Sequence, residues 1–272
     1  MAGSLYSLGS AVVSGGGGGT PAWMAVVDLD LTGLDALAMA GSGTTVYSLT
    51  KSSVAQASVT TSTNATSYDF SAGSGGVTYN TMSGTGTATV GFDLTTAFSK
   101  TGDTSLVWDD WADPVAVQLL FTGVTWGAAV QDLVAGLGEF LANPATTTVS
   151  FAWRGVTDTV DTDWKVRRYT TTSTESTVST NVAFASSYVL TLIIHAGIVT
   201  EMWYQPGATS IPTDPRAGTG PYSAGYTSVS NGAMPVVLQA FVPFFGIIRG
   251  GGGTDWAGTL AALRVSRFEV TA

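Results

Sequence analysis

The chain has 272 residues, of which only 11% are charged and 34 are glycine, and its formal net charge at pH 7 is −9. Two basic residues, Lys51 and Lys100, accompany eleven acidic residues before Arg154, and from Arg154 onward the two signs balance. This acidic first half excludes nucleic acid and anionic membranes as partners, because both require clustered lysine and arginine. Serine, threonine and glycine replace the missing charges, which predicts a strand-rich surface suited to packing among neighbouring subunits.

The chain contains no cysteine, which excludes disulfides and thiolate metal sites. Because no basic segment follows the first methionine, we expect no secretory signal. The apolar runs are too short, or too often interrupted by proline and glycine, to form a membrane-spanning helix. We therefore expect a protein that is assembled in a cytoplasm.

Residues 1–22 predict an arm that is separate from the folded domain, which we place at residues 23–272. The arm contains a run of five glycines, Gly15–Gly19, and such a run acts as a flexible tether. Its candidate assembly residues are apolar: Leu5, Tyr6, Leu8, Val12 and Val13. They either dock on a partner subunit or belong to a disordered tail or to a glycine loop between strands, and the sequence leaves these interpretations open.

Apolar residues alternate with polar ones over Trp23–Leu31, which predicts a half-exposed strand. Asp28, Asp30 and Gly33 have the spacing of the first half of a calcium-binding loop. Met39, however, occupies the twelfth position, where a glutamate would supply the bidentate ligand. We therefore expect a strand that ends in a turn, and no metal site.

Between residues 41 and 107, short β-type segments recur at intervals of roughly ten residues with turn residues between them, which is typical of a sandwich or barrel. The expected strands are Val46–Leu49, Tyr68–Phe70, Val77–Tyr79, Thr87–Leu94 and Leu106–Trp108.

The densest group of aromatic and acidic residues is Trp108-Asp109-Asp110-Trp111. Two indoles flanked by carboxylates can stack on a sugar ring and accept its hydroxyl protons. The alternative is a loop whose tryptophans cap the core and whose acids are solvated, and we favour this alternative.

One helix is expected, over Gly127–Ala142. Its apolar residues recur at steps of three and four, namely Val130, Leu133, Val134, Leu137, Phe140 and Leu141. Asn143-Pro144 would end the helix, whereas Gly136 and Gly138 weaken it. We expect it to pack over an edge or an end of the sheet.

From Thr147 the chain returns to strands. The expected ones are Thr147–Arg154, Trp164–Tyr169, Val178–Phe184, Pro235–Val242 and Ala261–Val270. Tyr188–Tyr204 predicts two further strands that meet at His195-Ala196-Gly197, and the first is apolar at nearly every position, as in a strand covered on both faces. His195, the only histidine, is interpreted as structural. A loop of about thirty residues follows the hairpin, and loops of this length are usually binding loops or contact surfaces.

The segments WRG, DWKVRRY, YVLTLIIHAGIVTEMWY, PVVLQAFV and LAALRVSRFEV succeed one another over Thr147–Val270. Their order resembles the C-terminal half of concanavalin A-like jelly rolls, the fold of legume lectins, laminin-G modules and many glucanases, and Trp23–Leu94 resembles it less closely. The resemblance implies an all-β, antiparallel two-sheet jelly-roll sandwich, here with one short helix. The carboxylate pattern Glu-x-Asp-x-x-Glu of the family's glucanases and the metal ligands of its lectins do not occur in the sequence.

The expected function is that of a virion structural protein on the surface of a phage particle: a capsid decoration, head-fibre or tail-associated subunit with a glycan-adhesive role. Its expected partners are capsid or tail protein subunits, further copies of itself in a homo-oligomer, for which we favour a trimer, and a host surface glycan. The alternative is a carbohydrate-binding module of a cell-surface protein. A glycoside hydrolase ranks third because the acids are not paired on one strand.

We expect no enzymatic activity and no cofactor, and we assign no catalytic or metal-binding residue. The candidate glycan-binding residues are Trp108, Asp109, Asp110, Trp111, Trp203 and Tyr222.

Overall fold

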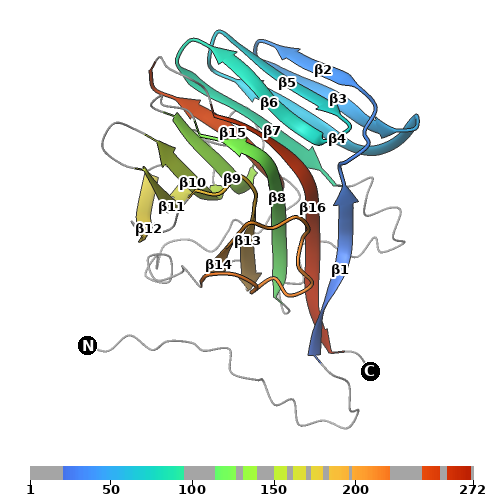
Figure 1. Ribbon diagram of the computed structural model, residues 1–272, viewed down its shortest axis with the longest axis vertical. Coiled ribbons are helices and arrows are strands. Elements are labelled where there is room, and N and C mark those ends of the chain that lie inside the picture. The colour runs from blue at the N-terminus through green and yellow to red at the C-terminus, as the bar shows by residue number, and fades with distance from the viewer. Residues whose placement is uncertain are drawn as a thin grey trace.

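The computed structural model describes residues 21–94, 114–126, 131–139, 150–157, 162–169, 173–179, 184–195, 198–220, 241–251 and 256–270. These ranges form sixteen strands in two antiparallel sheets and contain no helix (Figure 1). The expected all-β, two-sheet jelly-roll sandwich is therefore confirmed. Within these ranges, no helix is long and apolar enough to cross a membrane.

The first sheet, which we call sheet A, has the strand order β14-β13-β8-β16-β6-β5-β2, with β1 also paired to β16. Its strands are β1 (Pro21–Asp30), β2 (Leu37–Gly41), β5 (Ser67–Gly73), β6 (Gly76–Ser83), β8 (Val115–Thr125), β13 (Tyr188–His195), β14 (Ile198–Pro206) and β16 (Ala257–Val270). β16 pairs with β6 through Gly258–Leu260 and with β1 through Ala262–Val270, so it joins the two halves of the sheet (Figure 1).

The second sheet, sheet B, has the order β12-β11-β10-β9-β15-β7-β4-β3. Its strands are β3 (Thr44–Lys51), β4 (Val54–Thr63), β7 (Gly86–Asp93), β9 (Gln131–Glu139), β10 (Ser150–Thr157), β11 (Thr162–Tyr169), β12 (Ser173–Ser179) and β15 (Phe241–Arg249).

Aromatic rings from both sheets fill the space between them. Phe245 of β15 lies 5.5 Å from Phe121 of β8, centroid to centroid, in an edge-to-face arrangement. Trp164 of β11 lies 5.3 Å from Tyr188 of β13 in the same way. All four side chains are fully buried, and each stabilises the sandwich by about 1.5–3 kcal/mol through removal of apolar surface from water.

The helix expected over Gly127–Ala142 is wrong for residues 131–139, which form β9 between β10 and β15. Leu133, Ala135 and Leu137 face the main core, while Val134 is buried on the opposite face with Phe244. A central strand covered on both faces is apolar at nearly every position, and such a run also satisfies a helical spacing. The rest of the expected helix lies outside the described residues.

Most of the other strand predictions are confirmed, with shifted ends. Five expected segments lie within observed strands: Val46–Leu49 in β3, Tyr68–Phe70 in β5, Val77–Tyr79 in β6, Trp164–Tyr169 in β11 and Ala261–Val270 in β16. Thr87–Leu94 corresponds to β7. Thr147–Arg154 overlaps β10, whereas β12 begins before the expected Val178 and β15 begins after the expected Pro235. The prediction missed β2, β4 and β8, and Leu106–Trp108 lies outside the described residues.

The hairpin expected over Tyr188–Tyr204 is present as β13 and β14. Tyr188–Ile193 is buried without interruption, so the prediction of a strand covered on both faces is confirmed. Leu190 and Leu192 belong to the main core between the sheets. Because side chains alternate along a strand, Val189, Thr191 and Ile193 lie on the opposite side, which we call the outer face of sheet A.

Candidate functional site

The outer face of sheet A is covered by the segment that follows β14, residues 207–220, which we call the strap. Figure 1 shows it in orange, crossing β13 and β8 toward β16. Two strap side chains, Ala208 and Ile211, pack against small and apolar residues of the three strands beneath: Leu120, Val189 and Ala261. This contact explains why β13 is apolar on both of its faces.

The two ends of the strap are held by short backbone hydrogen bonds. The N–H of Gly207 donates to the carbonyl of Ser187 over 2.8 Å. Tyr204 and Thr219 exchange two bonds of 3.0 and 2.8 Å, so the end of the strap lies along the outer edge of β14. Gly218 permits this approach, because its φ is +105° and a Cβ there would lie 2.9 Å from the Cβ of Gln205.

Three side chains form a connected group where the strap returns to β14. Glu201 and Trp203 lie on the outer face, and the indole Nε1 of Trp203 donates to Glu201 Oε2 over 2.9 Å. Arg216 of the strap binds the same carboxylate through two parallel bonds, Nε to Oε2 at 2.8 Å and Nη2 to Oε1 at 2.9 Å. Its guanidinium also lies 5.6 Å from the ring centroid of Trp23 on β1. We call Trp203, Glu201, Arg216 and Trp23 the Trp-Glu-Arg cluster.

The electrostatics of the cluster keep Glu201 ionised. Burial is the largest single influence on its pKa and acts to raise it. The hydrogen bonds from Arg216 and Trp203 and the charge of Arg216 together outweigh burial, so the pKa of Glu201 falls below its ordinary value. The pKa of Arg216 is raised, chiefly by its hydrogen bonds to Glu201. The indoles of Trp203 and Trp23 are half-buried, so each retains accessible surface.

A row of side chains crosses the outer face at right angles to the strands. Strand register places Asp28 of β1 opposite Arg264 of β16, and Arg264 opposite Gln118 of β8. Gln118 in turn lies opposite Thr191 of β13, which lies opposite Trp203 of β14. We call these five residues the transverse row, and it ends in the Trp-Glu-Arg cluster.

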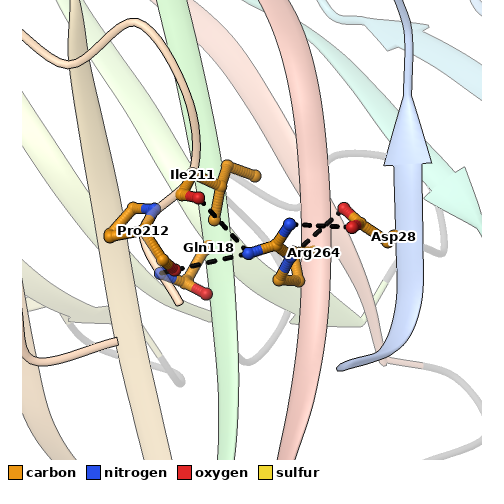
Figure 2. A network of polar contacts seen from close by, with 5 residues as sticks. All are labelled: Asp28, Gln118, Ile211, Pro212 and Arg264. Atoms are coloured by element: carbon orange, nitrogen blue, oxygen red, sulfur yellow. Dashed lines mark hydrogen bonds and ion pairs between the residues drawn. The ribbon is translucent and has the colours of Figure 1, made fainter. Parts of the chain in front are cut away.

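Arg264 is the centre of a polar network that links the transverse row to the strap (Figure 2). Its Nε and Nη2 donate to the carboxylate of Asp28 over 3.1 and 2.7 Å. Its Nη1 donates to the carbonyl oxygens of Ile211 and Pro212 over 3.3 and 3.4 Å. Gln118 Nε2 donates to the Pro212 carbonyl over 3.3 Å. The sheet thus presents hydrogen-bond donors, and the strap presents carbonyl oxygens to them.

The residues of the calcium-like segment are used in ordinary structural contacts. The carboxylate of Asp30 accepts bonds from the N–H and hydroxyl of Thr32 over 2.9 and 2.6 Å and pairs with Lys51 Nζ at 3.1 Å. The Thr32 hydroxyl is the main cause of the lowered pKa of Asp30. In the described part of the chain, no group of three or more histidine or acidic side chains is placed to hold a metal ion.

Of the six candidate glycan-binding residues, the structure describes Trp203 alone. Five of those candidates lie outside the described residues: Trp108, Asp109, Asp110, Trp111 and Tyr222. The same holds for the apolar residues of the arm, and β1 begins at Pro21, two residues before the expected domain start.

Sequence reasoning missed the partners of Trp203. The spacing of Glu201 and Trp203, two residues apart on one strand, was a usable signal that both lie on the same face. Nothing in the sequence pairs Glu201 with Arg216, fifteen residues later, or Gln118 with Arg264, because only strand register brings these side chains together.

No protein-family model matches the chain, and no curated protein matches it. Among solved structures, it is similar to a sialidase of Trypanosoma rangeli (14% identity, TM-score 0.34); the match covers 73% of this chain and 27% of that one. It is also similar to a carbohydrate esterase of the Shiga toxin-encoding bacteriophage phi24B (11% identity, TM-score 0.35; 90% and 99% covered). A third similar structure is the basic winged bean lectin with Tn-antigen (10% identity, TM-score 0.35; 86% and 98% covered). At these identities and scores, the likenesses assign no family, activity or partner to this chain.

Proposed function

We propose that this chain is a structural protein on the surface of a phage particle and that the outer face of its sheet A adheres to a glycan. The observation that supports adhesion is the Trp-Glu-Arg cluster. The half-buried indole of Trp203 is fixed by its bond to Glu201, which Arg216 fixes in turn. An indole that is already immobile loses little conformational entropy when a sugar ring stacks on it.

The same cluster favours binding over turnover. A glycosidase needs a carboxylic acid whose pKa is raised, so that it is protonated when it meets the leaving group. Glu201 has the opposite character, since its pKa is lowered and both of its oxygens accept bonds from Arg216. We therefore propose that the chain holds a glycan without cleaving it.

The proposed place on a virus particle rests on the surface chemistry of the chain. Hydroxyl pairs such as Ser67 with Ser83 at 2.7 Å and Thr78 with Thr259 at 2.8 Å link neighbouring strands of sheet A. With only 11% of residues charged, such a surface packs beside capsid or tail subunits, or beside copies of itself in a trimer, without strong charge repulsion. An antibody raised against the chain should label intact particles of the virus that encodes it. Labelling confined to disrupted particles or to host cells would contradict this location.

Glycan adhesion is tested with a glycan microarray probed by the wild-type chain, by Trp203→Ala and by Val46→Ala. Val46 is a suitable control because it is 66% exposed and lies on β3, in the other sheet. We expect Trp203→Ala to weaken binding by about tenfold or more, which corresponds to about 1.4 kcal/mol, and Val46→Ala to bind like the wild type. Equal binding by all three proteins would remove Trp203 from the site, and turnover of a bound glycan would refute the proposed absence of catalysis.

A further inference from the structure

Gln118 lies at the centre of the transverse row and is fully buried beneath the strap. Its Nε2 donates to the Pro212 carbonyl, but its Oε1 has no hydrogen-bond partner in the described part of the chain. A buried amide oxygen without a partner is unfavourable, because it loses the hydrogen bonds that water would donate to it. Such an atom needs an explanation, and a ligand that enters the site supplies one.

The strap is held firmly at its ends and weakly at its centre. The bonds at its ends measure 2.8–3.0 Å, and Arg216 adds its two bonds to Glu201. The bonds that the transverse row donates to the carbonyls of Ile211 and Pro212 measure 3.3–3.4 Å, beyond the usual range for N–H donors. Among residues 209–213, Ile211 alone is buried, so apolar contacts add little at the centre. This difference favours movement of the centre over movement of the ends.

We propose that the strap is a displaceable cover over a saccharide-binding groove formed by the transverse row. This inference rests on the proposed function and extends it from Trp203 along the row to Arg264. In the covered state, Gln118 and Arg264 donate hydrogen bonds to the carbonyl oxygens of the strap. When the centre of the strap lifts, the same two side chains donate to oxygen atoms of the ligand instead. A ligand hydroxyl then also donates to Gln118 Oε1, which the strap leaves without a partner.

The charges beneath the strap select a neutral ligand. Asp28 balances Arg264 through two bonds, and Glu201 balances Arg216 in the same way. The row therefore offers polar atoms without net positive charge, which suits sugar hydroxyls better than carboxylate or sulfate groups. From β16 to β14 the row crosses three strand spacings, about 14 Å, which fits an oligosaccharide better than a single sugar.

The test compares the wild-type chain with Gln118→Met and with Gln56→Met on a microarray of neutral, sialylated and uronate-containing oligosaccharides. Methionine keeps the length of glutamine but removes its amide, and Gln56, a less buried glutamine on β4 of the other sheet, controls for the substitution itself. We expect neutral oligosaccharides alone to bind, Gln118→Met to bind about tenfold more weakly, and Gln56→Met to bind normally. The urea unfolding midpoint confirms that each variant is folded.

Limited proteolysis with a protease of broad specificity supplies a second measurement that does not depend on a variant. Adding the neutral oligosaccharide that binds best should speed cleavage in the centre of the strap, residues 209–213, and leave the paired segments at Tyr204 and Thr219 uncleaved. A bound oligosaccharide that leaves the centre of the strap unchanged overturns the cover. If Gln118→Met binds normally while Trp203→Ala does not bind, the proposed groove is refuted but the adhesive function is kept. If the wild-type chain binds no glycan, both proposals are refuted.

Discussion

The ion pair between Arg216 and Glu201 should couple the strap to the sheet, and a double-mutant cycle measures that coupling. The variants are Arg216→Met, Glu201→Gln and the combination of both. Methionine keeps much of the apolar stem of arginine, and glutamine keeps the shape of glutamate, so each variant removes mainly the charge and its hydrogen bonds.

The expected magnitudes follow from burial and geometry. The Glu201 side chain is only 14% exposed and the Arg216 side chain 30%, so water screens the pair incompletely. Arg216→Met leaves the carboxylate with the single Trp203 bond and should lower the unfolding free energy by about 2–3 kcal/mol, since a charged hydrogen bond contributes about 1.5–3 kcal/mol. Glu201→Gln should cost about 1–2 kcal/mol by the same reasoning. Because the double variant leaves no unpaired charge, it should cost less than the sum of the two, with a coupling energy of about 1–2 kcal/mol.

Urea unfolding of the four proteins, followed by tryptophan fluorescence, provides the assay. Lys51→Met is the matched control, because Lys51 and Asp30 form an exposed ion pair that should contribute less than about 1 kcal/mol. If the Arg216 and Glu201 variants prove additive, or if Lys51→Met costs as much as Arg216→Met, the strap is not held by this ion pair and the argument fails.

Two further predictions concern packing and pH. Gly258→Ala should lower the unfolding free energy by about 1–3 kcal/mol, because the new Cβ would lie 2.5 Å from the buried indole of Trp256. Gly73→Ala serves as the control in the same urea experiment, because a Cβ at that position meets no atom within 4 Å. Because the pKa of Glu201 is lowered from 4.5, the stability that this carboxylate confers is fully present above pH 4.5 and is lost as the pH falls through the lower folded-state pKa. The urea midpoint of the wild type should therefore fall more steeply below pH 4.5 than the midpoint of Arg216→Met. Parallel curves for the two proteins would refute this role of Glu201.

The fold could be predicted from local patterns where a strand has one polar face or clear turn residues at its ends. Alternation located β1, and the uninterrupted apolar run Tyr188–Ile193 correctly indicated cover on both faces. The same kind of run over Gln131–Glu139 was interpreted as a helix, because a strand buried on both faces loses the two-residue alternation that identifies strands. Gly136 and Gly138 were the local signs against a helix there.

The candidate site could be predicted only in part. Trp203 was recognisable as an aromatic residue at the end of an apolar hairpin. Its electrostatic partner Arg216 and the buried Gln118 carry no local signal, because a salt bridge across a loop and a row across five strands depend on register. Strand register is a property of the whole sheet and cannot be read from one segment.

Binding of a glycan to the outer face of sheet A at Trp203 can be seen in a crystal structure of the chain with its best-binding neutral oligosaccharide. We expect a sugar ring stacked on the indole of Trp203, with further sugar units beneath a lifted strap and within hydrogen-bond distance of Gln118 and Arg264. An oligosaccharide bound on sheet B, or at residues remote from β14 and the strap, would contradict this expectation.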